Sequence, residues 1–121
     1  MKNILLVEDD PLLVDIYKTK LEESGFGVRV VQDGNAVQGA LESSKPDLIL
    51  LDIVLPNVDG WSILQAIKQN EKLRAIKVAI LSNLGQKEEI EKGVKLGADL
   101  YLIKAHYTPT QVVEEIKKLI P

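Results

Sequence analysis

The feature that most constrains the fold of this chain is a regular alternation of short apolar runs with longer amphipathic segments, repeated five times. Each short run is almost continuously apolar, which is typical of strands buried on both faces of a parallel sheet. The predicted strands cover residues 4–7, 28–31, 48–51, 78–81 and 100–103. We therefore expect an α/β fold with a doubly wound parallel (βα)5 sheet, because a closed barrel would need eight such units.

The amphipathic segments carry recognisable helix ends. Asp10 is a candidate N-cap for a first helix that begins at Pro11 and ends before Gly25. The buried face of this helix is expected to contain Leu12, Leu13, Ile16 and Leu21. The other helices are predicted over residues 35–43, 61–70, 87–96 and 109–120. The last of these is preceded by a capping box formed by Thr108 and Gln111.

Composition and charge exclude several classes of function. The chain has 121 residues, no cysteine and one histidine, His106, and we expect one domain over residues 1–121. Thiol nucleophiles and thiolate or three-histidine metal sites are therefore excluded. A net charge of -3 predicts no direct binding to nucleic acid. No apolar run is long enough for a membrane span or a signal peptide, so we expect a cytoplasmic protein with no membrane contact.

Polar side chains follow four of the five predicted strands, at the edge where open α/β sheets bind ligands. They are Glu8, Asp9 and Asp10 after the first strand, Asp52 after the third, Ser82 and Asn83 after the fourth, and Lys104 after the fifth. If the first and third strands are neighbours, Glu8, Asp9 and Asp52 converge, and three like charges in one place require a cation. Ligands that are all oxygen atoms favour Mg²⁺.

The charges of these residues indicate phosphoryl transfer. Mg²⁺ and Lys104 together balance the three carboxylates, so the charge of an incoming phosphoryl group is spread over a metal ion and an ammonium. Asp52 would be the nucleophile, because a carboxylate forms an acyl phosphate without a general base. The Ser82 hydroxyl would donate to a phosphoryl oxygen.

In order and spacing, these residues resemble the receiver domain of two-component response regulators, in the single-domain form of chemotaxis regulators, along essentially the whole chain. The matching segments are residues 5–10, 51–56 with Asp59 and Gly60, 81–82, 97–99 and 101–104. The resemblance implies the flavodoxin-like strand order 2-1-3-4-5. It also implies a phosphoacceptor that receives its phosphoryl group from a histidine kinase or phosphotransfer protein and acts on an unknown protein target.

The resemblance further assigns roles around the cation. It implies Asp52 as the phosphoacceptor, which also contacts the Mg²⁺ ion. Asp9 and the Val54 backbone carbonyl are implied as metal ligands, with Glu8 acting largely through water. Such a domain catalyses its own phosphorylation and a slow hydrolysis of the product, but its main role is that of a switch.

The residues in and after the fourth and fifth strands have further implied roles, and two positions there differ from the usual receiver-domain pattern. The resemblance implies Ser82 and Lys104 as contacts to the phosphoryl group, and Ser82 and Tyr101 as switch residues that move toward the site on phosphorylation. Receiver domains usually carry proline after the lysine, whereas Lys104 is followed by Ala105, so we expect a different path for this loop. Asn83 stands where a small residue is usual in receiver domains, and we expect its side chain to narrow access to the phosphoryl group.

Three other functions are compatible with the same architecture. One is a protein-interaction module that works without phosphorylation. Another is a flavin-binding electron carrier, which is disfavoured because no hydroxyl- and glycine-rich phosphate loop follows Val7. The third is a metal-dependent phosphatase with an aspartate nucleophile, which would need that nucleophile after the first strand.

Overall fold

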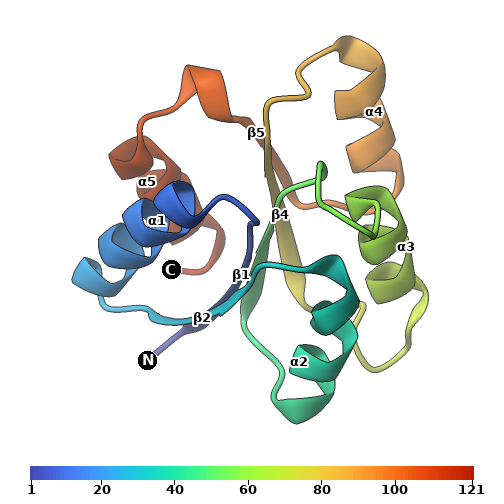
Figure 1. Cartoon of the computed structure of the whole chain (residues 1–121), viewed down its shortest axis with the longest axis horizontal. Helices are drawn as coiled ribbons and strands as arrows, with labels where there is room; N and C mark the ends of the chain where they lie inside the picture. The colour runs from blue at the N-terminus through green and yellow to red at the C-terminus, as the bar shows by residue number, and fades with distance from the viewer.

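The computed structural model describes residues 1–121, in which five strands alternate with five α-helices (Figure 1). The strands are β1 Asn3–Val7, β2 Gly27–Val31, β3 Leu48–Leu51, β4 Lys77–Ser82 and β5 Leu100–Ile103. The helices are α1 Pro11–Glu23, α2 Val37–Ser43, α3 Gly60–Gln69, α4 Lys87–Lys95 and α5 Pro109–Leu119, with short 3₁₀ turns η1 Gly34–Ala36 and η2 Lys104–His106. None of these helices is long and apolar enough to cross a membrane.

The strands form one parallel sheet in the order β2-β1-β3-β4-β5, which confirms the predicted fold. Figure 1 shows α1 and α5 on one face of the sheet and α2, α3 and α4 on the other. The strand order reverses between β1 and β3, and Val7 is in register with Leu51 across that pair. The residues that follow these two strands are therefore brought side by side at the carboxyl edge.

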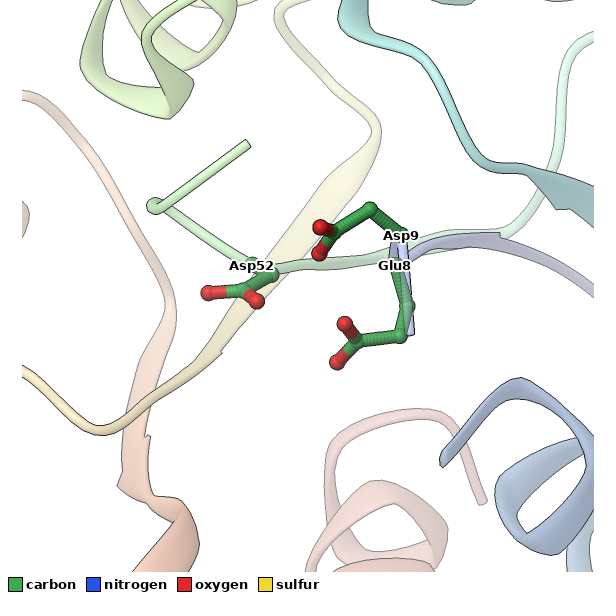
Figure 2. Close-up of side chains that lie close together, drawn as sticks. All are labelled: Glu8, Asp9 and Asp52. Atoms are coloured by element: carbon green, nitrogen blue, oxygen red, sulfur yellow. The ribbon is translucent and has the colours of Figure 1, made fainter. Parts of the chain in front are cut away.

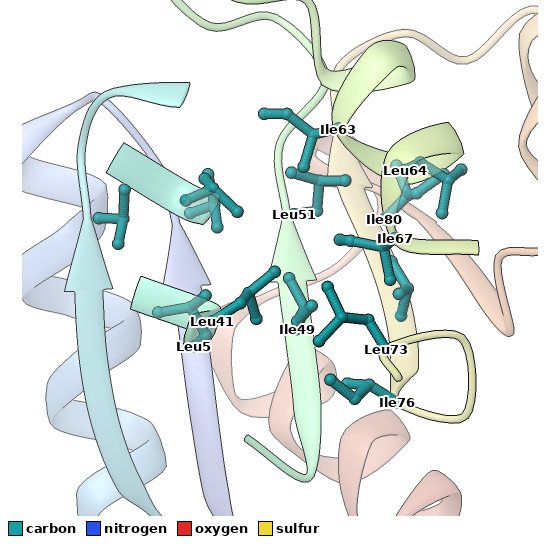
Figure 3. Close-up of a cluster of buried hydrophobic side chains, with 14 of the residues drawn as sticks. Leu5, Leu41, Ile49, Leu51, Ile63, Leu64, Ile67, Leu73, Ile76 and Ile80 are labelled. Carbon is teal, nitrogen blue, oxygen red and sulfur yellow. The ribbon is translucent and has the colours of Figure 1, made fainter. Parts of the chain in front are cut away.

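Two apolar layers hold the sheet between its helices. One layer joins the sheet to α2 and α3, where Ile63, Leu64 and Ile67 pack onto Ile49 and Leu51 (Figure 3). The other joins the opposite face to α1 and α5. All four residues of β3 are fully buried, because this central strand is covered on both faces, which explains its uninterrupted apolar sequence.

Helix ends follow the predicted signals. The Leu12 N–H donates to Asp10 Oδ1 at 2.9 Å, so Asp10 caps α1. The side chains of Thr108 and Gln111 each accept a hydrogen bond from the other's backbone N–H, at 3.1 and 2.8 Å. Gly97, which follows α4, has a φ of +104° that favours glycine.

The buried face of α1 differs from the prediction at one position. Leu12 was expected on that face, but it is 67% exposed, and the prediction is wrong for this residue. Tyr17 and Leu21 are buried, with Leu13 half-buried one turn before them. Residues 13, 17 and 21 share one stripe at four-residue spacing, and Leu12 lies about 100° away around the helix. The prediction left Tyr17 out of the buried face, although the apolar part of its ring is buried there.

Gly60 joins the start of α3 directly to the segment after β3. Its N–H donates to the Ile53 carbonyl at 2.9 Å. A Cβ at this position would lie 2.7 Å from the Asp52 carbonyl oxygen and 2.8 Å from that of Ile53, with the Ile53 Cα closer still. A side chain is excluded here because the neighbouring atoms are backbone, which has little freedom to move.

We expect Gly60→Ala to lower the free energy of unfolding by about 1–3 kcal/mol, the usual cost of an overpacked contact. The matched control is Gly39→Ala in α2, where a Cβ would meet nothing within 4 Å. This control should gain about 0.5–1 kcal/mol because alanine is the better helix former. Urea unfolding of both variants measures the difference, and equal effects would contradict the close approach at Gly60.

Candidate functional site

Three carboxylates meet at the carboxyl ends of β1 and β3. Glu8 and Asp9 follow β1, Asp52 follows β3, and one oxygen atom from each lies within 4.8 Å of the others (Figure 2). Glu8 is 2% exposed and Asp52 is 6% exposed, whereas Asp9 is exposed. The predicted convergence of these three residues is therefore present in the structure.

Backbone hydrogen bonds extend the sheet ladder by one residue into the site. The Asp52 N–H donates to the Val7 carbonyl at 3.0 Å, and the Glu8 N–H donates to the Val31 carbonyl at 3.1 Å. The carboxylates also accept local bonds, from the Val54 N–H to Asp52 Oδ1 and from the Asp10 N–H to Glu8 Oε2, each at 3.2 Å. The sheet thus fixes the main-chain positions of Glu8 and Asp52.

Lys104, which follows β5, joins the two buried carboxylates. Its Nζ donates to Glu8 Oε1 at 2.6 Å and to Asp52 Oδ2 at 2.9 Å. These are short, charge-assisted hydrogen bonds with little solvent around them, because only 12% of the lysine side chain is exposed. One ammonium is therefore shared by two of the three carboxylates and offsets only one of their negative charges.

Burial and hydrogen bonding act in opposite directions on the pKa values of Glu8 and Lys104. Burial raises the pKa of the Glu8 carboxyl, and the hydrogen bonds from Lys104 and from the Asp10 N–H offset part of that effect. Burial acts to lower the pKa of Lys104, but the hydrogen bonds to Glu8 and Asp52 outweigh it and raise the pKa above its ordinary value. The lysine is therefore a cation at neutral pH.

The two expected switch residues are linked through the backbone of Leu84. Ser82 is fully buried, and its Oγ accepts from the Leu84 N–H at 3.2 Å. The Tyr101 hydroxyl donates to the Leu84 carbonyl, and burial raises the pKa of this tyrosine, which keeps the donor protonated. Sequence reasoning missed Leu84 as a link between Ser82 and Tyr101, because this contact uses main-chain atoms that carry no residue signature.

The position of the Tyr101 ring adds to this link. The prediction has Tyr101 turning inward on phosphorylation, but here the ring already packs against the core layer next to α3. A Cβ on Gly93 of α4 would lie 2.9 Å from the Tyr101 ring, so glycine lets α4 approach it closely.

A hollow of about 340 Å³ opens over the acidic cluster. Its lining consists of Glu8, Asp9, Asp10, Leu13, Asp52, Val54, Ser82, Asn83 and Lys104. Every predicted site residue except Tyr101 is therefore at this hollow, together with Leu13, which the sequence analysis placed only in a helix core. Asn83 is exposed, so its side chain lies at the rim.

The segment after Lys104 forms the short turn η2, with all peptide bonds in the chain trans. Ala105 and His106 are exposed. His106 does not line the hollow.

A family model, the response regulator receiver domain, matches residues 4–117 of this chain. The chain belongs to this family. A DNA-binding dual master transcriptional regulator, RpaA of Synechocystis, is 38% identical over 104 residues, which cover 86% of this chain and 43% of RpaA. The alkaline phosphatase synthesis regulator PhoP of Bacillus subtilis is 34% identical over 121 residues, 98% of this chain and 48% of PhoP. The receiver domain spans about half the length of these curated relatives.

Solved structures agree with this assignment. The Mn²⁺-bound form of the response regulator Rcp1 superposes with a TM-score of 0.89 at 29% identity, over 99% of this chain and 94% of that one. The BeF3-activated DrrB receiver domain gives 0.87 at 26% identity, over 99% and 97%. The chemotaxis protein CheY4 of Vibrio cholerae, at 19% identity and a TM-score of 0.89 over 98% of both chains, shares the fold.

The residues of this receiver domain fit a hard divalent cation. The donors are carboxylate oxygens alone, with no nitrogen or sulfur ligand among them, which is the donor set that Mg²⁺ prefers. With Lys104 ionised, the cluster of Glu8, Asp9 and Asp52 still carries a net negative charge. Asp9 is exposed and has no ion-pair partner, which leaves one side of the cluster open to solvent.

We expect Lys104→Met to tighten Mg²⁺ binding by about tenfold, because the variant removes a positive charge that repels the cation at short range. Lys72→Met is the control, since it removes the same charge from an exposed position outside the hollow. Calorimetric titration at pH 8 in physiological salt compares the dissociation constants. Unchanged or weaker binding in Lys104→Met would show that the ammonium does not compete with the cation.

Proposed function

We propose that this receiver domain accepts a phosphoryl group on Asp52 from a phosphohistidine on a histidine kinase or phosphotransfer protein, and that Mg²⁺ is the cofactor. The observation that carries the proposal is the setting of the Asp52 carboxylate. One oxygen bonds the Val54 N–H and the other bonds Lys104, within a hollow that also holds Glu8 and Asp9. In this proposal Glu8, Asp9, Asp52 and the Val54 carbonyl hold the cation.

The transfer needs no proton from the acceptor. A carboxylate oxygen of Asp52 forms the new bond to phosphorus while the phosphorus–nitrogen bond of the donor breaks, and the imidazole keeps that electron pair. An ammonium has three N–H donors, and Lys104 uses two of them on Glu8 and Asp52, so the third is free for a phosphoryl oxygen. Bound Mg²⁺ supplies further positive charge against the phosphoryl oxygens.

In this proposal the hydroxyl of Ser82 couples phosphorylation of Asp52 to a change at the protein surface. Its Oγ accepts from Leu84 in this structure, and its own proton remains available to a phosphoryl oxygen. A shift of Ser82 toward the phosphoryl group changes its bond to Leu84, whose carbonyl holds Tyr101. Tyr101 in turn lies beside α4, where a Cβ on Gly93 would be 2.9 Å from its ring. We infer that the output is a change in the surface formed by α4, β5 and α5.

A protein is the expected target of that surface. The relatives RpaA and PhoP are named as DNA-binding and transcriptional regulators, but the matched region covers about half of each. A net charge of -3 gives this receiver domain no cationic field that would attract nucleic acid.

We expect the wild type to gain one phosphoryl group from acetyl phosphate and Mg²⁺, labile to hydroxylamine, because Asp52 supplies the nucleophile. Asp52→Asn should gain none. Asp47→Asn is the matched control, since Asp47 is an exposed aspartate at the opposite end of β3 and should be labelled like the wild type. Intact-mass spectrometry measures all three proteins.

Two results would contradict the proposal in different ways. Full labelling of Asp52→Asn would move the acceptor to another residue. A folded wild type that binds neither Mg²⁺ nor a phosphoryl group would favour an interaction module that works without phosphorylation.

The phosphoryl group on Asp52 should be long-lived. The resemblance to receiver domains implies that Val54 and Leu84, each two residues after a site residue, flank the path of the attacking water, and neither side chain can orient that water by a hydrogen bond. We therefore expect slow hydrolysis, and several-fold faster decay in Val54→Asn and in Leu84→Glu. Val94→Asn is the control, since Val94 is an exposed valine on α4. If neither variant decays faster than this control, these side chains do not limit hydrolysis.

A further inference from the structure

A carboxylate outside the acidic cluster holds the loop that follows the phosphoacceptor. This loop, residues 53–59, connects β3 to α3 and is called the β3–α3 loop here. Asp33, which follows β2, accepts from the Asn35 N–H through Oδ1 at 2.9 Å and from the Asn57 side-chain amide through Oδ2 at 3.0 Å. One carboxylate therefore caps η1 and also binds a residue 24 positions further along the chain.

The conformation of Asn57 shows why this bond matters. Asn57 has a φ of +70° and is the only residue other than glycine with a positive φ. The Val58 N–H donates to the Pro56 carbonyl at 2.8 Å, which closes a three-residue turn around Asn57. A tight turn of this kind with positive φ at its centre is uncommon and strained, and it persists only where neighbouring contacts hold it. The bond from Asn57 to Asp33 is such a contact.

The loop is also fixed at its base and along its inner side. The Gly60 N–H bonds the Ile53 carbonyl at 2.9 Å and closes the base. Val58 packs against Gly34, where a Cβ would lie only 2.8 Å from the Val58 Cβ. Between these anchors lies Val54, whose side chain is 61% exposed and whose N–H donates to Asp52 Oδ1. The position of the Val54 main chain therefore depends on the anchors of the loop.

We propose that Asp33 is a positioning residue for the phosphoacceptor site, because its bond to Asn57 holds the β3–α3 loop so that the Val54 main chain faces Asp52. This inference rests on the proposed function, in which the Val54 carbonyl is a metal ligand. Loss of the bond lets the loop move, weakens the binding of Mg²⁺ and slows phosphorylation when Mg²⁺ is limiting. Neither Asp33 nor Asn57 lines the hollow, so their effect is transmitted through the loop.

The test uses Asn57→Gly, which removes the amide, keeps the net charge and allows the positive φ. The control is Asn35→Gly, a neighbouring asparagine whose side chain makes no hydrogen bond. We expect the Mg²⁺ dissociation constant of Asn57→Gly to rise about tenfold, the lower end of the effect of residues that orient metal ligands. Labelling by acetyl phosphate should be slower at limiting Mg²⁺ and recover at saturating Mg²⁺.

A rescue variant separates positioning from stability. Asp33→Asn combined with Asn57→Asp exchanges donor and acceptor, keeps the net charge and restores an amide-to-carboxylate bond. This double variant should bind Mg²⁺ like the wild type, whereas Asn57→Asp alone places two carboxylates together and should not. A merely structural role would lower the free energy of unfolding in urea and leave the dissociation constant unchanged.

The outcomes distinguish this inference from the proposed function. Equal Mg²⁺ affinity in Asn57→Gly and Asn35→Gly, with the wild type binding and labelled, overturns the role of Asp33 alone. If the wild type binds no Mg²⁺, the proposed function fails, and hydrogen exchange of the Val54 amide in metal-free protein tests the inference instead. Faster exchange in Asn57→Gly than in Asn35→Gly supports it, and equal exchange overturns it.

Discussion

The ammonium of Lys104 bonds two carboxylates that the sheet buries side by side, and the site depends on this contact. Glu8 and Asp52 follow strands that end in register, so backbone pairing holds their main chains side by side. Two buried, ionised carboxylates that lie close together repel each other unless a cation is paired with them. Lys104, which follows the edge strand β5, supplies that cation and so links the carboxyl ends of β1, β3 and β5.

The Lys104 ammonium does not neutralise the whole acidic cluster. Asp9 remains unpaired and exposed, so the cluster keeps a net negative charge and a set of oxygen donors that fits a divalent metal. Two backbone links lead away from this centre. The main chain of Leu84 joins Ser82 to Tyr101 and α4, and the β3–α3 loop joins Asp52 to Asp33. We propose that the first link carries the signal outward and that the second holds the phosphoacceptor in place.

Sequence periodicity was sufficient to predict every strand and helix, because strands covered on both faces have continuous apolar runs. The polar site residues were predictable because they follow those strands directly. Strand order came from family resemblance, since no local pattern specifies which strands are neighbours. Leu12 was wrongly placed on the buried face and Tyr17 was missed, because helical spacing alone leaves the exact position of the buried stripe open by one residue. The bonds of Leu84 and Asn57 were missed because they involve main-chain atoms or partners far away in the sequence.

Reduction of the phosphorylated protein with borohydride tests the central claim most directly, because it converts the acyl phosphate of an aspartate into homoserine at the modified position. Peptide sequencing by mass spectrometry then locates that residue. The account predicts homoserine at position 52 and at no other acidic residue, and only when Mg²⁺ is present during phosphorylation. Homoserine at position 9, or a reduced glutamate at position 8, would contradict the assignment of Asp52 as the phosphoacceptor.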